Sequence, residues 1–473
     1  MGFFGWLFRW LGWSAEPRDD WASQASSHSN EGRNFERPPE SSADRVSQQP
    51  IEHDSQSAAL QSPTKSASTS SPAIRPRKKL LTRPKLTPTL RDKSRHDARK
   101  SHATFVEVTG AAPYRYARFG SGTGRHLDLS QDGDEARLRA RGLPVFHTPE
   151  QLADWLGIPL KKIAWLVHRF TAGRPNNIEQ AHYHFRWLKK KSGGWRLIES
   201  PKQLLKQAQV KILREVLDHI PTHSAAHGFV VGRSIVTNAK PHVGHATLVK
   251  LDLSNFYATV GFSRVVALFR AVGYSREAAI WLGLLTTSAI PGNMAFPDRD
   301  PYALEPYLRR HLPQGAPTSP ALANLSAYRL DLRLAGLSKS FGATYTRYAD
   351  DLAISGPQEL ASGLRVLIPL VQQIIRGERF RVNTSKRRVL RAHQRQSIAG
   401  VVVNAKPNVA RDQFDRLKAT LTNCVRLGPS TQNLDQVEDF TSHLRGRIAH
   451  IQQLNRPRGD KLLALFNRID WQR

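Results

Sequence analysis

The sequence predicts an α+β fold preceded by a long amino-terminal extension that has too few apolar residues to fold by itself. Three observations lead to this prediction. Residues 15–100 are rich in Ser, Gln, Pro, Arg and Lys, apolar strand-like runs end at acidic residues near positions 252 and 350, and residues 405–473 carry apolar positions at helical spacing. Of the 473 residues, 40% are hydrophobic, which is enough for a real core and for about three domains.

The formal net charge of +31 predicts a polyanionic partner. So large a charge makes a compact body repel itself unless a polyanion offsets it, and nucleic acid is the first such partner to expect. An anionic membrane surface is the alternative, although no stretch supplies the roughly 20 apolar residues that span a bilayer. A single cysteine, Cys424, leaves no internal disulfide, and there is no Cys/His zinc spacing, so the cytoplasm is the expected compartment.

Residues 1–14 form an apolar aromatic segment. Three Trp, three Phe and two Leu surround a single charge, Arg9, in the first thirteen residues. The segment lacks the basic start and small-residue cleavage site of a signal peptide. Two interpretations stay open: an interfacial helix that attaches the protein peripherally to a membrane surface, or a docking peptide for an effector protein.

Residues 15–100 are expected to be a disordered basic linker, because such a composition cannot bury enough surface to repay its ordering entropy. Its basic run, residues 74–85, is either a solvated tether or an RNA-binding arm. For the rest of the extension, 101–147, the sequence predicts no particular fold. The run Gly120-Ser121-Gly122-Thr123-Gly124 lacks the Lys-Ser pair of a phosphate-binding loop and is interpreted as a flexible loop.

Order is expected to begin near Thr148. Thr148, Pro149 and Gln151 have the spacing of a helix N-cap, a proline at the first helical position and a capping-box partner. A second short helix is expected around residues 163–167. Alternating apolar residues at 183–188, then Gly193-Gly194 and a second apolar run, predict a β-hairpin with a basic rim.

The candidate catalytic residues are three aspartates on an otherwise basic chain. Asp252 ends the apolar run that starts at Leu248, and Asp350 and Asp351 lie between two β-prone runs in an Ala-Asp-Asp turn. Adjacent aspartates repel each other unless they are exposed or neutralised by cations. Mg²⁺ prefers a few carboxylates plus the substrate's own phosphates, so the three acids suit a site for two Mg²⁺ ions, for which Mn²⁺ can substitute. The plain alternative is an ordinary Asx-rich turn.

The order of the motifs argues against that alternative. Tyr348-Ala349-Asp350-Asp351 resembles the catalytic tetrapeptide of reverse transcriptases, and Asp252 lies in what resembles their first aspartate motif. Between them, residues 312–320 are similar to the Gln-Gly motif of these enzymes. Further along the chain, residues 380–386 resemble their fourth motif. The resemblance implies a right-hand polymerase with fingers (148–245), palm (246–404) and thumb (405–473), acting as an RNA-directed DNA polymerase.

Within that class, residues 227–242 resemble the insertion that retron enzymes carry before the first aspartate motif, including its Asn-Ala-x-x-His signature. The long basic extension is similar to that of myxobacterial-style retron enzymes. One departure is Ile398-Ala399-Gly400, where retron enzymes have Val-Thr-Gly. The retron resemblance implies a structured non-coding RNA as template and primer, dNTPs, a lasting RNA-DNA product, a host ribonuclease H and a place in phage defence.

The resemblance also implies roles for individual residues. Tyr257 is expected to lie under the sugar of the incoming nucleotide and to exclude a 2′-hydroxyl, with a core tyrosine as the alternative. Gln314 and Arg196 are expected to bind the nucleotide, since a guanidinium fork suits phosphate oxygens. The fourth-motif lysine, Lys386, is expected to protonate pyrophosphate. The metal ligands are then Asp252, Leu253, Asp350 and Asp351.

RNA contacts are predicted in two places. Asn238 and His242 belong to the retron-like signature, with a satisfied structural histidine as the alternative. Residues 408–428 form an expected amphipathic helix whose basic face, with Arg411 and Lys418, suits a thumb that tracks phosphates. Its alternative is a solvated bundle surface, and a basic helical tail is expected to follow.

Two rival functions remain open. One is another bacterial reverse transcriptase, either an intron maturase or an untemplated defence polymerase. The other is a catalytically idle ribonucleoprotein scaffold, against which the three intact aspartates count.

Overall fold

The computed structural model describes residues 106–119, 124–168, 175–190, 193–297 and 304–472. The chain divides into two units, Met1–Leu86 and Thr87–Arg473, and every described residue belongs to the second. The predictions for the apolar start, the linker, its basic run and most of the glycine-rich loop therefore lie outside the described residues. Within the described ranges, no helix is long and apolar enough to cross a bilayer.

A four-stranded antiparallel sheet carries the candidate catalytic residues. In spatial order its strands are β7 (Thr344–Tyr348), β8 (Asp351–Gly356), β6 (Thr247–Asp252) and β9 (Arg388–Arg391). The predicted apolar run is the central strand β6, buried on both faces. Its side chains alternate between two cores: Val249 and Leu251 enter the larger one, and Leu248 enters the second.

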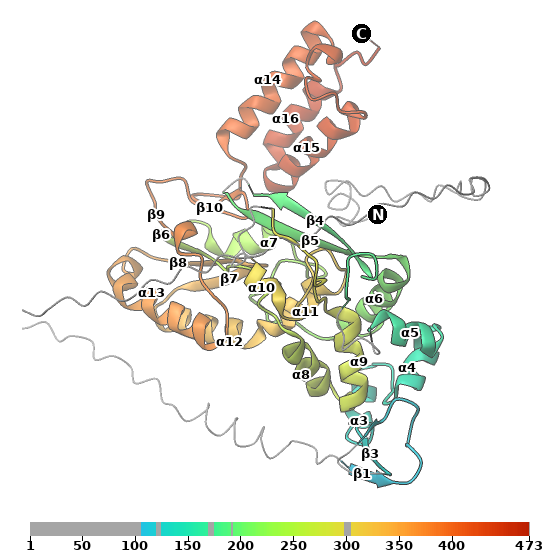
Figure 1. Ribbon diagram of the computed structural model, residues 1–473. Helices are drawn as coiled ribbons and strands as arrows, with labels where there is room; N and C mark the ends of the chain where they lie inside the picture. The colour runs from blue at the N-terminus through green and yellow to red at the C-terminus, as the bar shows by residue number, and fades with distance from the viewer. Residues whose placement is uncertain (1–105, 120–123, 169–174, 191–192, 298–303, 473) are drawn as a thin grey trace, which may run out of the picture. The chain divides into compact units, whose positions relative to one another are not determined.

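Helices cover both faces of this sheet. On the face of Val249 and Leu251, α12 (Tyr328–Ser340) and α13 (Leu360–Gly377) pack side by side beneath the strands (Figure 1). The same core includes α8 (Phe262–Val272), α9 (Arg276–Thr286) and α11 (Ser319–Ser326). The opposite face meets α7 (Ile235–Ala239) and the 3-10 turn η2 (Lys240–His242), so that Ala239 packs with Leu248 and Ala353.

The predicted helix start and hairpin are confirmed. Thr148 caps α4 (Pro149–Leu156) with a complete capping box to Gln151, and Gly157 ends the helix in the left-handed conformation. The following elements are α5 (Leu160–Leu166), α6 (Gln203–Glu215), η1 (Leu217–His219) and α10 (Glu305–Leu308). The hairpin pairs β4 (Tyr183–Lys189) with β5 (Trp195–Pro201).

The expectation that order begins near Thr148 is wrong. A three-stranded sheet of β1 (Val106–Thr109), β3 (Arg125–Asp128) and β2 (Arg118–Phe119) precedes it, followed by α3 (Glu135–Ala140). These short polar elements dock on α8 and α9: Asp134 N donates to Gly273 O at 2.7 Å, and Arg270 pairs with Asp132 at 2.7 Å. Their stability depends on partners more than 100 residues away, which no local pattern reveals.

The carboxy-terminal part is helical, as predicted. Its helices are α14 (Arg411–Leu427), α15 (Phe440–Leu454) and α16 (Arg456–Phe466), with η5 (Pro429–Thr431) after α14. They share a core that includes Leu421, Ile448 and Leu462. Before them, η4 (Thr384–Lys386) leads into β9, and the departure Ile398-Ala399-Gly400 forms the tight turn between β10 (Ser397–Ile398) and β11 (Val401–Val402). The mixed α+β expectation is therefore confirmed, and the division into fingers, palm and thumb stays a prediction.

Candidate active site

The three candidate aspartates converge at one end of the four-stranded sheet. Asp252, the last residue of β6, is the cross-strand partner of Asp351, the first residue of β8. The main-chain N–H of Leu253 donates to the carbonyl of Asp350 at 2.9 Å. Asp252 is buried, Asp350 is half-buried and Asp351 is exposed, so the group is reachable from one side. Leu253 can serve a metal only through its carbonyl oxygen, since its side chain has no donor atom.

The electrostatics of this cluster favour a bound cation. Burial, together with the negative charges of Asp351 and Asp252, raises the pKa of Asp350 to about 6. Lys386 opposes this effect, and its Nζ donates to Asp252 Oδ1 at 2.9 Å. In the described part of the chain, no three His, Cys, Asp or Glu side chains already form a metal cage. The donor set nevertheless fits Mg²⁺, because it consists of carboxylate oxygens whose negative charge Lys386 offsets only in part.

Two of the predicted nucleotide-binding residues lie beside this cluster. Tyr257 follows a tight turn at Asn255, whose φ is 49°, and it is half-buried. Burial and the charge of Asp350 raise the pKa of Tyr257, while Arg196 acts in the opposite direction. The charges of both residues therefore act on the Tyr257 hydroxyl. Arg196 is exposed on β5, and its guanidinium is free to meet a phosphate.

Lys190 is a further basic residue of the site that the sequence alone did not single out. It directly follows β4 at the hairpin turn, where its N–H donates to Gly194 O at 2.9 Å. Burial lowers the pKa of Lys190, as do the charges of Arg196 and Lys386, and Asp252 opposes them. The hairpin pairing of Leu188 with Arg196 brings these cations together. That pairing, predictable from Gly193-Gly194, is the signal that could have identified Lys190.

The loop that carries Gln314 is fixed to the hairpin. Glu199 on β5 and His311 form a fully buried ion pair, with 2.8 Å between Glu199 Oε2 and His311 Nε2. Glu199 N also donates to the Gln314 carbonyl at 2.9 Å. A side chain at Gly315, whose φ is 133°, would place its Cβ 2.9 Å from Glu199 O. Gln314 therefore keeps a fixed position relative to Arg196.

The Glu199–His311 pair predicts a pH dependence of stability. Burial alone lowers the pKa of His311, but Glu199 outweighs burial and the opposing charge of Arg310, so the pKa lies above its usual 6.5. A raised folded-state pKa means that this stabilisation is fully present below about 6.5 and is lost as pH rises through the raised value. Over this pH range, the free energy of unfolding of the wild type should therefore fall more than that of His311→Gln. Thermal unfolding of both proteins measures the difference. An equal pH profile in both proteins would contradict the prediction.

The structure does not support RNA contact by Asn238 and His242. Their exposed fractions are 1% and 0%. The ring of His242 bonds Ser355 Oγ through Nδ1 at 2.6 Å and Thr346 Oγ1 through Nε2 at 2.8 Å. Burial lowers the pKa of His242 to about 3, so the ring is neutral and offers phosphate no charge. The signature instead joins η2 to both strands of the aspartate hairpin, through partners more than 100 residues later in the chain.

We therefore expect His242→Ala to impair initiation on the partner RNA and extension of a generic annealed primer by the same factor. The change removes one hydrogen bond from each of two buried hydroxyls, which keep His245 and the Asn238 carbonyl as partners, and should lower the free energy of unfolding by about 1–3 kcal/mol. Primer-extension rates on both substrates and thermal unfolding measure this, with Lys240→Ala, an exposed neighbour on η2, as the control. Selective loss of initiation in a fully stable His242→Ala protein would restore the RNA-contact interpretation.

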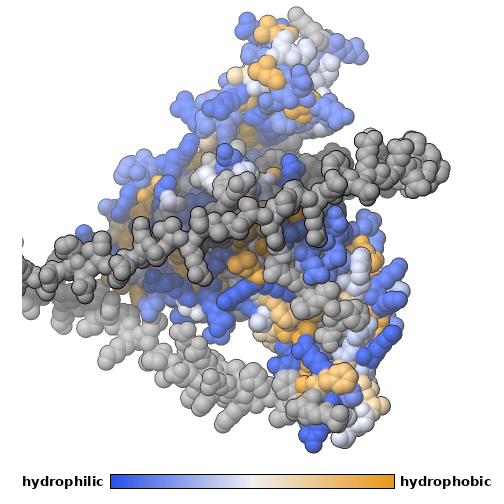
Figure 2. Space-filling view, viewed as in Figure 1, coloured by the Kyte–Doolittle hydropathy of each residue, from blue (hydrophilic) through white to orange (hydrophobic). Residues whose placement is uncertain are grey.

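The predicted basic face of the carboxy-terminal helices is exposed. Arg411 and Lys418 lie on the solvent side of α14, and Arg411 pairs with Asp415 at 3.5 Å. Figure 2 shows hydrophilic residues over most of the visible surface of α14–α16. Both side chains are thus available to phosphates, although Asp415 offsets part of the charge of Arg411.

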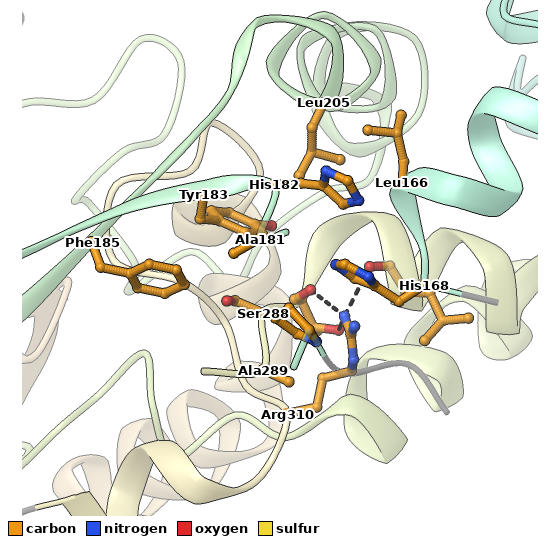
Figure 3. A pocket seen from close by; sticks show the side chains of 13 residues that line it. Leu166, His168, Ala181, His182, Tyr183, Phe185, Leu205, Ser288, Ala289 and Arg310 are labelled. Carbon is orange, nitrogen blue, oxygen red and sulfur yellow. Dashed lines mark hydrogen bonds between the residues drawn. The ribbon is translucent and has the colours of Figure 1, made fainter. Parts of the chain in front are cut away.

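A separate small pocket lies beside Arg310 and Ser288 (Figure 3). It is lined by His168, His182, Tyr183 and Arg310 among others, and by none of the predicted site residues. Arg310 donates to the carbonyls of Leu284 and Thr287. Burial lowers the pKa of Arg310 to about 10. These contacts indicate a structural joint between α9 and the loop that leads to Gln314.

Comparisons with known proteins agree with this geometry. Residues 188–410 match the reverse transcriptase (RNA-dependent DNA polymerase) family. The chain is 39% identical over 336 residues to the retron Mx65 reverse transcriptase of Myxococcus xanthus, covering 70% of this chain and 73% of that protein. For the retron Mx162 reverse transcriptase of the same organism, the identity is 36% over 352 residues, covering 71% and 70%.

More distant similarities extend the comparison. The retron Ec86 reverse transcriptase of Escherichia coli is 26% identical over 340 residues, covering 71% of this chain and 93% of that protein. Among solved structures, telomerase from Candida albicans in complex with a fragment of telomeric RNA has a TM-score of 0.38 and 10% identity. It covers 77% of this chain and 70% of that chain, and a similarity this low supports no functional conclusion.

Proposed function

The chain belongs to the retron reverse transcriptase family and is an RNA-directed DNA polymerase, and from this premise we propose that it copies a structured partner RNA into a short, RNA-linked single-stranded DNA. The observation that carries the proposal is the convergence of Asp252, Asp350 and Asp351 at the open end of the sheet. The proposed setting is anti-phage defence in the cytoplasm. Fingers (148–245), palm (246–404) and thumb (405–473) are the proposed parts of the polymerase.

The reaction joins a deoxynucleotide to a primer hydroxyl and releases pyrophosphate. When bound at Asp252, Asp350, Asp351 and the Leu253 carbonyl, two Mg²⁺ or Mn²⁺ ions would activate the hydroxyl and offset the charge of the leaving pyrophosphate. The residues of the chain do the positioning. Tyr257, whose hydroxyl interacts electrostatically with Asp350, is proposed to support the sugar with its ring.

The phosphates and the leaving group meet the basic residues. Arg196 and Lys190, which interact across the β4–β5 hairpin, are placed to hold the triphosphate. Gln314 is held against the same hairpin through Glu199 and can donate an amide hydrogen bond to the nucleotide. Lys386 contacts Asp252 and is 46% exposed, so its ammonium can turn toward pyrophosphate and give up a proton.

The partner RNA is proposed to act as both template and primer, with synthesis starting from one of its 2′-hydroxyl groups. Arg411 and Lys418 of the thumb would track its phosphates, and a host ribonuclease H would remove the copied template. The apolar start (1–14) is proposed to bind an effector protein or a membrane surface.

Sequencing of nucleic acid that co-purifies with the full chain tests the proposed function. One short DNA of defined sequence, joined to RNA and absent from an Asp350→Ala/Asp351→Ala preparation, is the expected result. DNA of many unrelated sequences would instead identify an untemplated polymerase. Structured RNA without any DNA would favour a ribonucleoprotein scaffold.

Deletion of residues 1–100 is expected to leave extension of a pre-annealed primer largely unchanged. Every proposed site residue lies beyond Lys189, and a segment whose composition predicts a flexible tether is not expected to position a catalytic group to within an ångström. The deletion should weaken co-purification with an effector or binding to liposomes. Assays at saturating template exclude a loss of RNA affinity caused by removing the basic run. A folded but inactive truncated enzyme under those conditions would show that the segment belongs to the catalytic body.

A further inference from the structure

The turn that carries the aspartates has an unfavourable backbone conformation that needs support. Ala349 has a φ of 54°, in the left-handed region that alanine rarely adopts. The residue next to it, Asp350, interacts electrostatically with Asp252. Such conformations cost about 1–3 kcal/mol and persist only where the surroundings hold them. The contacts around Ala349 show what holds this one.

One buried arginine holds the turn through a hydrogen bond to its main chain. Arg347 is fully buried, and its Nη1 donates to the carbonyl of Ala349 at 3.0 Å. Its Nε and Nη2 donate to the two carboxylate oxygens of Asp331 on α12, at 2.7 and 2.6 Å. Nη1 also donates to Asn324 Oδ1 on α11 at 2.9 Å. The guanidinium is thus locked to two helices and presents one remaining contact to the turn.

Stability alone does not account for this arrangement. A fully buried ion pair is often no more stabilising than apolar side chains of the same volume, because burial removes both charges from water. What apolar side chains cannot supply is a hydrogen-bond donor at a fixed point beneath the carbonyl of Ala349. The pair is therefore best explained by the position that it imposes on the turn.

A second segment, residues 225–228, packs against the turn. Asn324 Nδ2 donates to the carbonyl of Gly228 at 2.8 Å, which holds that glycine against the turn. A Cβ at Gly228 would lie 2.7 Å from the main-chain nitrogen of Ala349. Arg347 N donates to Ala225 O and His227 N donates to Arg347 O, each at 2.8 Å, so this segment pairs with the edge of β7. Ala349 therefore has backbone on one side and a guanidinium on the other.

We propose that Arg347, anchored by Asp331 and Asn324 and opposed by Gly228, is a positioning residue that fixes the Ala349 turn and so sets the place of Asp350 relative to Asp252. The inference rests on the proposed role of Asp350 in metal binding. It also makes the start of the retron-like segment, residues 225–228, part of the support of the catalytic turn.

The paired variant Arg347→Met/Asp331→Leu tests whether the ion pair positions the Ala349 turn or only stabilises the fold. It replaces the buried charges with apolar side chains of similar size, so the protein should fold and bind RNA, while the donor to Ala349 is lost. We expect kcat to fall about tenfold to hundredfold, as for a misplacement of about 1 Å, and the Mg²⁺ concentration for half-maximal rate to rise several-fold. A folded variant with wild-type kcat and wild-type Mg²⁺ dependence would overturn the proposal.

Gly228→Ala probes the same turn from the opposite side without touching the ion pair, and it keeps the test decisive if the paired variant does not fold. The added methyl group should displace Ala349 and produce the same rise in the Mg²⁺ requirement. Gly336→Ala is the matched control, since a Cβ there meets nothing within 4 Å. Arg333→Met removes the half-exposed ion pair between Arg333, on α12, and Glu378. It controls for the loss of a salt bridge.

Asp350→Ala in the same assays distinguishes failure of the proposed function of the aspartates from failure of the positioning role of Arg347. If Asp350→Ala retains the wild-type rate, the proposed function of the aspartates fails. If Asp350→Ala is inactive while Gly228→Ala and the paired variant both match the wild type in kcat and Mg²⁺ dependence, only the positioning role of Arg347 fails.

Discussion

An enzyme in which Asp350 and Asp351 are both alanine is expected to make no detectable DNA and to bind its RNA nearly as well as the wild type. The two carboxylates lie at the open end of the sheet beside Asp252, where they repel one another and raise the pKa of Asp350. Without them a cation has too few ligands, and loss of metal positioning removes the chemical step. The phosphate contacts that dominate RNA affinity lie elsewhere and remain.

Primer extension and filter binding with the same RNA measure the two effects. The double substitution raises the net charge of +31 by two, which by itself strengthens RNA binding. Asp435→Ala/Glu438→Ala is the charge-matched control, because both residues are exposed and lie before α15. Wild-type extension rates in the Asp350→Ala/Asp351→Ala enzyme would reject the assignment of the site.

Tyr257→Ala is expected to admit ribonucleotides far better than the wild-type enzyme does. The charges of Asp350 and Arg196 both act on the Tyr257 hydroxyl, and its ring is proposed to lie between the metal ligands and the phosphate contacts. A ring beneath the sugar excludes a 2′-hydroxyl by its bulk. Its removal should reduce discrimination between dNTPs and rNTPs by about tenfold or more, the usual effect of a small group in a close-fitting pocket.

The steric explanation is tested by comparing Tyr257→Ala with Tyr257→Phe. Phenylalanine keeps the ring and removes only the hydroxyl, so it should discriminate as the wild type does. Single-nucleotide incorporation with matched dNTP and rNTP gives the ratio of kcat/KM values. Since Tyr257 also packs against the main core, thermal unfolding of each variant is measured in parallel. Unchanged discrimination in Tyr257→Ala would leave Tyr257 with the core role alone.

Many elements follow from local sequence patterns. The capping box at Thr148, the hairpin around Gly193-Gly194 and the strand that ends at Asp252 form as their patterns predict. Each of these depends on residues that are close together in the sequence. Their local hydrogen bonds and hydrophobic periodicity leave few alternative conformations. The same holds for the amphipathic helix α14.

Two features could not be decided from the sequence for the same physical reason. His242 was interpreted as an RNA contact from the retron-like signature, with a structural histidine as the alternative, and residues 101–147 were given no particular fold. In the structure, His242 finds its partners in Thr346 and Ser355, and the short strands find theirs on α8 and α9. The energy that decides between surface and interior comes in both cases from partners far along the chain.

The sequence by itself determined the chemical identity of this protein: the three aspartates, their order among the motifs and the strands that carry them. Only the tertiary structure decided what holds them in place. The sequence did not single out Arg347, yet in the structure it is fully buried and is held by Asp331 and Asn324. A charge enters the interior only when partners from separate elements satisfy all its hydrogen bonds together, and such a meeting exists only after the chain has folded.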